Sequence, residues 1–441
     1  MTAFTELGVP QNIADALTKR GITAAFPIQA LTIADAMAGR DVCGRAPTGS
    51  GKTLAFGIPM AALAREAAPR RPSVLVLVPT RELASQVAEV VRPLAQARNL
   101  HTAAFYGGTS IGKDRVRLDR GIDIAIACPG RLADLVERGY ADLRDVRFVV
   151  IDEADRMADM GFLPEVKRLL DRTHADRQTL LFSATLDGDV DVLIKRYQRK
   201  PVRHELMETP EEKGDVQHFF WTTPATDRVQ LTANIIGNVA PAIVFTRTKH
   251  GADRVAKQLA RRGVAAAAIH GDRSQKQRER ALADFTGGRV TTLVATDVAA
   301  RGIHVDDVGV VVHFDPAGTD KDYVHRSGRT GRAGADGLVV TLVSPDKAKD
   351  VKALQRALGL RQGVEPVRLE AMTGGRPLAP RATVAEAAAP AVPGPSGHAR
   401  QEKRRTPANG ARPHRGNAGG PSRSGKPGRR RGAGPQSQLR K

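Results

Sequence analysis

One octapeptide constrains the fold of this chain more than any other stretch. It reads Ala46-Pro47-Thr48-Gly49-Ser50-Gly51-Lys52-Thr53 and precedes a segment, 54–68, with apolar residues at helical spacing. Gly49 and Gly51 permit the left-handed backbone that aims successive N–H groups at an anion, and the positive end of a helix follows them. The stretch predicts a phosphate-binding loop between a strand and a helix, although Ala46 stands where the general pattern has glycine. A glycine-rich turn that binds nothing is the alternative.

An acidic tetrapeptide supplies the expected partner of this loop. The apolar stretch 146–151 ends directly in Asp152-Glu153-Ala154-Asp155. Lys52 is placed to reach the β- and γ-phosphates of a nucleotide, and the Thr53 hydroxyl is placed to ligate Mg²⁺. A carboxylate at the tip of a buried strand suits the same ion, so we expect Asp152 to bind it directly or through water, and Glu153 to deprotonate the attacking water. An acidic helix N-cap is the alternative for these carboxylates.

The loop and the Asp-Glu-Ala-Asp tetrapeptide together resemble the DEAD-box family of ATP-dependent RNA helicases. Matching motifs occur in the family's order over residues 4–332. The resemblance implies two tandem RecA-like α/β domains, each a parallel sheet flanked by helices. It also implies ATP and Mg²⁺ as cofactors, with Lys52, Asp152 and Glu153 in catalysis.

A glutamine motif precedes the loop. A glutamine amide can accept from adenine N6–H and donate to N7, which guanine cannot match. The family uses a glutamine after Pro-Ile in this way, with an upstream aromatic residue stacked on the base, and Gln29 and Phe4 fit these roles. Ala25-Phe26 replaces the family's usual Pro-Thr. Taken alone, Gln29 reads as an ordinary residue at a helix start.

The second half of the chain is expected to complete the nucleotide site. Arg329 and Arg332 resemble the family's arginine fingers, and such guanidinium donors are worth roughly 10³ to 10⁵ in rate. A generic basic patch is the alternative. Gly302 matches the family's nucleotide-binding set, whereas His304 stands where the family has an aspartate that contacts the ribose.

The resemblance also assigns residues to coupling and to RNA contact. Coupling between ATP and strand separation falls to Asp155, Ser183, Thr185 and His325, although a plain N-cap explains either hydroxyl as simply. Cys128 replaces a threonine at the start of one RNA motif, and Gly-Gly or Pro-Gly pairs alone are more often plain turns. The expected contacts with the RNA backbone are Pro79, Thr80, Arg81, Gly108, Pro129, Gly130, Arg131, Arg247, Thr248, Gly271 and Thr296.

Strand and helix signals alternate twice along the chain, and only the first alternation carries a phosphate loop. This pattern predicts one nucleotide site shared between two similar domains. The predicted divisions are an N-terminal ATP-binding domain with the glutamine motif, a linker, a C-terminal helicase domain and a disordered Ala/Pro spacer with a basic tail, at residues 1–205, 206–215, 216–362 and 363–441.

Charge and composition indicate which kinds of binding partner and which cellular location to expect. The net charge is +21, and residues 400–441 contribute thirteen Lys and Arg against one acid, or 13 − 1 = +12. Such a tail favours binding to a polyanion, although it also fits a tail that only aids solubility. Two cysteines without zinc spacing, no apolar leader and no long apolar run favour a cytoplasmic protein that does not contact membranes.

The function expected from these features is RNA-stimulated ATP hydrolysis that unwinds or remodels short RNA duplexes and ribonucleoprotein complexes. RNA is the expected partner, and ribosomal or RNA-decay proteins are further candidates. Aromatic residues make up only 4% of the chain, so contacts to phosphate and sugar without sequence preference are expected. Two alternatives stay open: a non-catalytic RNA clamp or annealing factor that uses the tail, and a DNA translocase.

Deleting residues 400–441 should flatten the salt dependence of RNA binding. If the tail makes about five phosphate contacts, the single-strand slope of about −0.7 per contact predicts an approximately hundredfold loss of affinity between 50 and 200 mM salt. Binding isotherms of the full chain and the truncated chain check this. An unchanged slope after truncation means that the tail is not the anchor.

Overall fold

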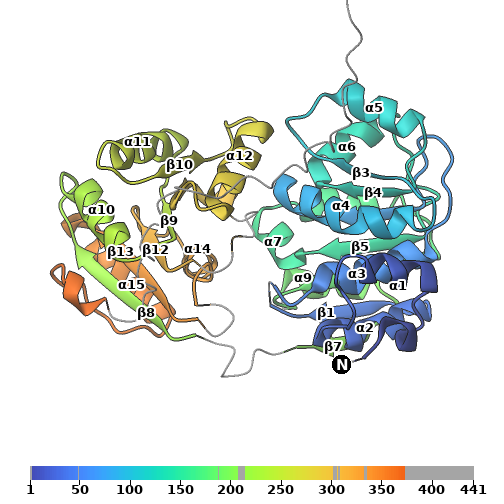
Figure 1. Cartoon of the computed structure of the whole chain (residues 1–441), viewed down its shortest axis with the longest axis horizontal. Helices are drawn as coiled ribbons and strands as arrows, with labels where there is room; N and C mark the ends of the chain where they lie inside the picture. Colours follow the sequence, from blue (N-terminus) through green and yellow to red (C-terminus); the bar gives the residue numbers. More distant parts are fainter. Residues whose placement is uncertain are drawn as a thin grey trace, which may run out of the picture. The chain divides into compact units, whose positions relative to one another are not determined.

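Two parallel sheets organise the chain (Figure 1). The computed structural model describes residues 2–47, 49–186, 188–206, 214–300, 305, 308–331 and 335–372. Within these residues one sheet has seven strands, the other has six, and the strands of each sheet pair in parallel. The predicted fold class of two tandem α/β domains is confirmed.

The first sheet has the strand order β3-β4-β2-β5-β6-β1-β7. Its strands are β1 (Val42–Arg45), β2 (Val74–Leu77), β3 (Thr102–Phe105), β4 (Ile124–Ala127), β5 (Phe148–Asp152), β6 (Gln178–Ser183) and β7 (Val202–Glu205). The accompanying helices are η1 (Phe4–Leu7), α1 (Gln11–Thr18), α2 (Pro27–Met37), α3 (Lys52–Leu63), α4 (Arg81–Gln96), α5 (Ile111–Asp119), α6 (Pro129–Glu137), α7 (Ala154–Asp159), α8 (Leu163–Leu170) and α9 (Asp189–Tyr197).

The second sheet has the order β10-β11-β9-β12-β13-β8. Its strands are β8 (Val216–Thr222), β9 (Ala242–Phe245), β10 (Ala266–Ile269), β11 (Thr292–Ala295), β12 (Val310–His313) and β13 (Gly337–Val343). The helices are α10 (Arg228–Asn238), α11 (Lys249–Ala260), α12 (Gln275–Thr286), α13 (Asp297–Ala300), α14 (Asp320–Ser327), η3 (Pro345–Lys347), α15 (Ala348–Ala357) and η4 (Leu369–Ala371).

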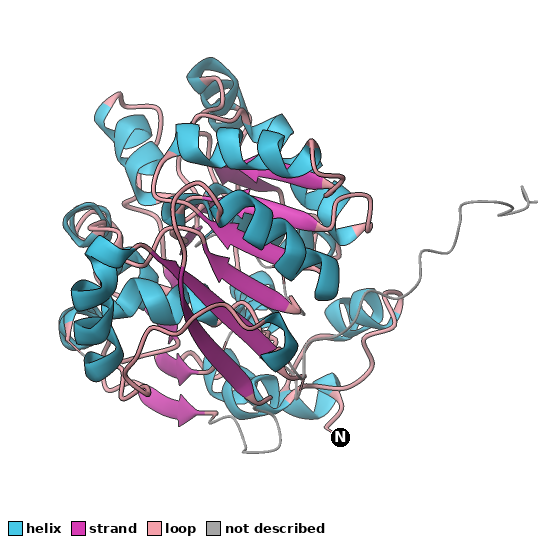
Figure 2. Cartoon of the chain, turned by 90° about the vertical axis from the view of Figure 1, so that its left-hand side faces the viewer, coloured by secondary structure: helices cyan, strands magenta, loops and turns pink. Residues whose placement is uncertain are grey.

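Apolar residues on both faces of the strands explain why helices cover both faces of the sheets (Figure 2). Every residue of β2, β4 and β9 is buried. Alternate residues of one strand join different cores: Val74 and Val76 pack in one cluster, and Leu75 and Leu77 pack in the other. Among the described residues, no helix is both long enough and apolar enough to cross a lipid bilayer.

The helix after the phosphate loop is shorter than predicted. It ends at Leu63 rather than at residue 68, because Ala64 adopts an extended backbone with ψ of 148°. Sequence reasoning did not single out strand β8, which pairs with β13. Strand β7 ends at Glu205 and β8 begins at Val216, so the predicted linker lies between the two sheets, although its residues 207–213 fall outside the described part.

The second domain extends beyond its predicted end at residue 362. Glu365 exchanges two main-chain hydrogen bonds with β8, of 2.8 and 2.9 Å, and Leu369 and Met372 pack on the core around Trp221. The fully buried Gln355 amide donates to the Gly363 carbonyl at 2.8 Å and accepts from its N–H at 3.0 Å. Residues 363–372 therefore belong to this domain, and assigning them to the spacer was wrong.

Two truncated chains test whether the second domain ends at residue 362 or at residue 372. A chain that ends after Gln362 loses the contacts with β8 and leaves the buried Gln355 amide without partners, which should lower the free energy of unfolding by roughly 2–4 kcal/mol. A chain that ends after Met372 keeps these contacts and should unfold like the full chain. Urea unfolding followed by Trp221 fluorescence measures the difference, and equal midpoints for the two truncations contradict the assignment.

Candidate functional site

The phosphate loop joins β1 to α3, as the sequence predicts. Gly49 and Gly51 both have φ of +90°, a conformation that favours glycine. The Lys52 ammonium donates to the carbonyl oxygens of Ala46 at 2.6 Å and Pro47 at 2.9 Å. Burial lowers the pKa of Lys52, although Asp152 and other acids nearby oppose the shift. Thr48 lies outside the described residues.

The two expected catalytic carboxylates lie at the end of β5. Asp152 is the last residue of the strand, and Glu153 follows with φ of +53° at the start of α7. Burial, reinforced by the Glu153 charge, raises the pKa of Asp152 to about 7, whereas Lys52 lowers it. The Glu153 carboxylate pairs with the Arg156 guanidinium at 2.6 Å, and both side chains are only 9% exposed. The pair fixes the orientation of the candidate base.

The coupling residues Asp155, Ser183 and Thr185 meet through main-chain groups. The Asp155 carboxylate accepts from the N–H groups of Ala184 at 3.2 Å and Thr185 at 3.3 Å. The Ser183 hydroxyl accepts from the Asp155 N–H at 3.1 Å. Main-chain N–H groups at the end of β6 and the start of α7 therefore connect these residues. The His325 ring lies 3.5 Å from the Asp159 carboxylate.

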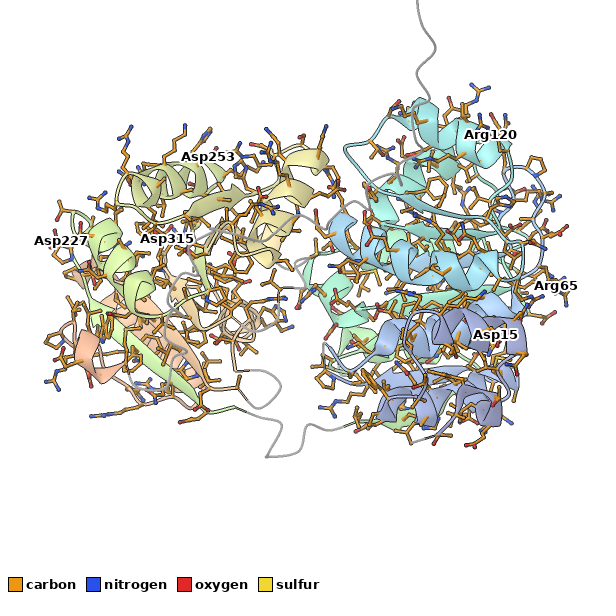
Figure 3. All side chains as sticks on the ribbon, in the orientation of Figure 1. Asp15, Arg65, Arg120, Asp227, Asp253 and Asp315 are labelled. Carbon is orange, nitrogen blue, oxygen red and sulfur yellow. The ribbon has the colours of Figure 1, made fainter. Side chains whose placement is uncertain are left out.

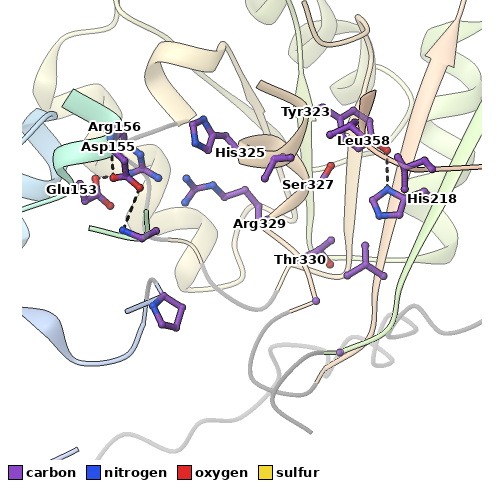
Figure 4. Close-up of a pocket in the computed structure, with 18 of the residues that line it drawn as sticks. Glu153, Asp155, Arg156, His218, Tyr323, His325, Ser327, Arg329, Thr330 and Leu358 are labelled. Carbon is purple, nitrogen blue, oxygen red and sulfur yellow. Dashed lines mark hydrogen bonds and ion pairs between the residues drawn. The ribbon is translucent and has the colours of Figure 1, made fainter. Parts of the chain in front are cut away.

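A cavity of about 670 Å³ brings these groups together with the second domain (Figure 4). Lys52, Glu153 and Asp155 line it together with Arg329, whose guanidinium points toward the acidic side. The volume lies within the range of about 300–1,000 Å³ that is typical of small-molecule sites. The cavity thus joins the phosphate loop to one of the two predicted arginine fingers. Arg332 and Gly302 lie outside the described residues.

Gln29 and Phe4, the residues expected to bind adenine, both have contacts within the protein. The Gln29 amide accepts from the Phe26 N–H at 3.0 Å and donates to the Gly51 carbonyl at 3.0 Å, and the residue is 2% exposed. Both of its polar atoms are engaged within the protein. Phe4 is 4% exposed and packs in a core with Ile13 and other apolar residues, so it has no free face for a base. The stacking of Phe4 on adenine stays a prediction, which would require the ring to become accessible.

The expected RNA contacts of the first domain follow β2, β3 and β4. Thr80 is the N-cap of α4, and its hydroxyl accepts from the Leu83 N–H at 3.3 Å. The Arg81 guanidinium lies against Gly108, where an added Cβ would come within 2.3 Å of it. Pro79 is the buried residue before this cap. Thr80 therefore has a structural role, whereas the Arg81 guanidinium lies beside the loop that carries Gly108.

Arg131 is a structural residue rather than an exposed phosphate ligand. It lies in the first turn of α6, after Pro129 and Gly130, and its side chain is only 10% exposed. Its guanidinium pairs with the Asp114 carboxylate at 2.5 Å and donates to the Thr109 carbonyl at 2.8 Å. Both contacts hold the loop that carries Gly108. Arg131 thus helps to position that loop, and its direct contact with RNA stays a prediction.

The second domain places its RNA candidates after β9, β10 and β11. Arg247 is exposed, and its N–H donates to Asp315 at 2.8 Å. Thr248 caps α11, Gly271 lies beside Lys249, and Thr296 is buried at the end of β11. Asp253, labelled with Asp315 in Figure 3, accepts from the His270 ring at 3.0 Å and pairs with Arg273. These carboxylates fix the loops that follow the strands.

Sequence reasoning missed two charged contacts. Arg156 follows Glu153 by three residues, a helical spacing that could have revealed their pair. Glu82 and Arg278, from α4 and α12, approach to 2.7 Å with side-chain exposures of only 3% and 7%, although the atoms lack the alignment of a hydrogen bond. No local spacing predicts this second contact, because its partners lie far apart in the sequence.

Arg131→Ala should destabilise the fold. It leaves the Asp114 carboxylate, 1% exposed, without its main cation, and removing one partner of a buried pair costs roughly 3–5 kcal/mol. Arg138→Ala is the control, because Arg138 on the same helix pairs with Asp134 at the exposed surface and should barely shift the midpoint. Urea unfolding measures both variants. Unchanged stability with weakened RNA binding would restore Arg131 as a phosphate ligand.

Two family models match the chain. The DEAD/DEAH box helicase model covers residues 26–193, and the helicase conserved C-terminal domain model covers residues 227–334. The first match lies within the part of the chain that forms the seven-stranded sheet and its helices, and the second lies within the part that forms the six-stranded sheet and its helices.

Known proteins of this kind are similar over most of the chain. The mitochondrial DEAD-box ATP-dependent RNA helicase 9 of Arabidopsis thaliana is 41% identical over 81% of this chain and 60% of its own length. The DEAD-box ATP-dependent RNA helicase 30 of the same plant is 39% identical over 86% of this chain and 68% of its own length. The chain thus spans less than two thirds of the length of the first of these relatives. The structure of S. cerevisiae Dbp5 bound to RNA and ADP BeF3 has a TM-score of 0.70 at 25% identity, covering 84% of this chain and 96% of that one. The chain belongs to the DEAD-box family of ATP-dependent RNA helicases.

Proposed function

We propose that this chain hydrolyses ATP in response to RNA and uses the cycle to open short duplexes or to remodel ribonucleoprotein complexes. The observation that carries the proposal is the cavity in which Lys52, the Glu153 carboxylate and the Arg329 guanidinium converge. A phosphate loop, a candidate base and an arginine from the second domain are the parts that phosphoryl transfer requires. The RNA-bound Dbp5 structure and the named helicase relatives support the choice of RNA.

The roles of the residues follow from their surroundings. Water attacks the γ-phosphorus, its proton passes to Glu153, and the bond between the γ-phosphorus and the bridging oxygen breaks to leave ADP. Arg156 holds the Glu153 carboxylate in one orientation. Lys52 leaves the carbonyls of its loop to bind phosphate oxygens. Arg329, and Arg332 by proposal from the sequence alone, stabilise the negative charge of the transition state.

The acidic end of β5 fits a divalent cation. Asp152 is 3% exposed beside a second carboxylate, and the rise of its pKa reflects a desolvated negative charge that a cation would stabilise. We propose that Asp152, directly or through water, and Thr53 in the first turn of α3 hold Mg²⁺. The ion would neutralise phosphate charge. Within the described part of the chain, no group of three or more His, Cys, Asp or Glu side chains forms a metal site by itself, at the end of β5 or elsewhere.

RNA is proposed to lie across the loops that follow β2, β3 and β4 in the first domain and β9, β10 and β11 in the second. Arg81 and Arg247 are the basic candidates there, and main-chain groups near Gly108 and Gly271 are the uncharged ones. Each ligand that contacts both domains favours their closed arrangement, so ATP and RNA should bind cooperatively. A cytoplasmic location stays a prediction, which the two unbridged cysteines support.

Glu153→Gln should lower the rate of RNA-stimulated ATP hydrolysis by about 10²- to 10⁴-fold, because the amide cannot accept the proton of water. Glu137→Gln is the control, because Glu137 pairs with Arg168 at the surface. Steady-state hydrolysis at low salt is measured without nucleic acid, with single-stranded RNA and with single-stranded DNA. Hydrolysis that is stimulated by DNA would support the alternative of a DNA translocase. RNA binding without any hydrolysis would support the alternative of a non-catalytic RNA clamp.

A further inference from the structure

The outward face of α11 carries basic side chains at helical spacing. Arg254, Lys257 and the C-cap residue Arg261 follow one another at intervals of three and four residues, and all are exposed. Side chains with nitrogen ends project outward along this helix beside the labelled Asp253 (Figure 3). The opposite face of the helix packs in a core of the second domain through the buried residues Ala252, Val255, Ala256 and Leu259. We call Arg254, Lys257 and Arg261 the basic stripe.

The charges of the basic stripe are not neutralised within the described part of the chain. None of its three side chains forms an ion pair or a side-chain hydrogen bond there. Asp253 is the one acidic residue of α11, and it is engaged by the His270 ring at 3.0 Å and by Arg273. Like charges three or four residues apart destabilise a helix. A bound polyanion would remove this repulsion.

The basic stripe begins where the loops of the second domain come together. Thr248, in the loop after β9, is the N-cap of α11. Lys249, in the first turn, pairs at 2.6 Å with Asp272 of the loop after β10. At a rise of about 1.5 Å per residue, the helix carries the stripe about 20 Å from Thr248 to Arg261. The stripe therefore continues from the two loops to which we propose that RNA binds.

A second set of basic residues in this domain lacks that position. Lys349, Lys352 and Arg356 are exposed on α15, also at intervals of three and four residues, and they form no ion pair within the described residues. However, α15 packs near β8, and β8 and β10 are the opposite edges of the sheet (Figure 1). This set therefore supplies a matched control of equal charge.

The chemistry of the stripe favours a nucleic acid over a protein partner. Protein interfaces have an apolar centre and few lysines. In the described part of the chain, the exposed large apolar side chains all belong to elements other than α11. A nucleic-acid strand in a helix carries one negative charge about every 3.4 Å, so several phosphates fit along a stripe of this length.

We propose that the basic stripe binds the sugar–phosphate backbone of RNA that continues past the loops after β9 and β10. Contacts with phosphate carry no sequence information, so the stripe lengthens the binding site without adding sequence preference. The inference rests on the proposed binding of RNA at these loops. It implies that the affinity depends on RNA length, because a short strand that occupies the loops does not reach the stripe.

Anisotropy titrations of the full chain test the proposal with single-stranded RNAs of about 8 and about 24 nucleotides, in the presence of Mg²⁺ and a non-hydrolysable ATP analogue. The triple variant Arg254→Gln, Lys257→Gln, Arg261→Gln should bind the long RNA with a salt slope that is shallower by about 2, because each single-strand contact contributes about −0.7. At about 100 mM salt, its affinity should fall by up to about a hundredfold. Its affinity for the short RNA should stay within about threefold of the original, less than the loss of one contact.

Two further variants separate the stripe from total charge and from guanidinium geometry. The triple variant Lys349→Gln, Lys352→Gln, Arg356→Gln removes the same charge from α15 and should change the slope by less than one contact. The double variant Arg254→Lys, Arg261→Lys keeps the charges and should keep the slope, because a phosphate attracts either cation. Melting temperatures close to that of the unchanged chain confirm that the variants are folded.

Three results would overturn the proposal. They are an unchanged slope for the long RNA in the α11 variant, which would leave the face to solvent or to an acidic protein, an equal effect in the α15 variant, and an equal loss for the short RNA. Failure of the proposed function is separate, since it is the absence of RNA-stimulated hydrolysis in the unchanged chain. A chain that binds RNA without hydrolysing ATP still decides the role of the stripe.

Discussion

The parallel direction of the strands is the constraint on which the site depends. The loops that follow parallel strands all emerge at one edge of the sheet, and ligands bind at that edge. In the first sheet, the nucleotide and coupling candidates lie at or after the ends of β1, β5 and β6, which are neighbours, and the RNA candidates follow β2, β3 and β4, which are neighbours as well. The strand order therefore separates the two ligands into adjoining halves of one edge, although their motifs alternate along the sequence.

The two halves meet at a single strand pair in each sheet. In the first sheet β2 pairs with β5, and Leu77 lies opposite Ile151, so the loop with Arg81 begins beside the loop with Asp152. In the second sheet β9 pairs with β12, and Phe245 lies opposite His313. Neighbouring strands are only about 4.8 Å apart, so a shift in one loop is felt by the other through main-chain contacts. This adjacency gives the coupling of ATP and RNA a short physical route.

Local patterns predicted the parts of the molecule that depend on local chemistry. Gly49, Gly51 and the carboxylates after β5 occupy the expected places, because backbone freedom and strand ends determine them. The sequence could not tell that Phe4 would be enclosed and Phe26 exposed, since both are phenylalanines near the same motif and only packing separates them. The ion pair of Arg131 was missed for a similar reason, because its partner Asp114 lies on another helix and no local spacing predicts the contact.

The contacts of Lys52 have a consequence for how tightly nucleotide is held. Its ammonium already occupies the carbonyls of Ala46 and Pro47, so the loop is closed on itself. Phosphate must therefore replace these carbonyls as the partner of the Lys52 ammonium. The apparent affinity for nucleotide is then the intrinsic affinity multiplied by the fraction of chains in which Lys52 has left the carbonyls. The equilibrium between these two positions of Lys52 thus lowers the apparent affinity for nucleotide, independently of any contact with the base.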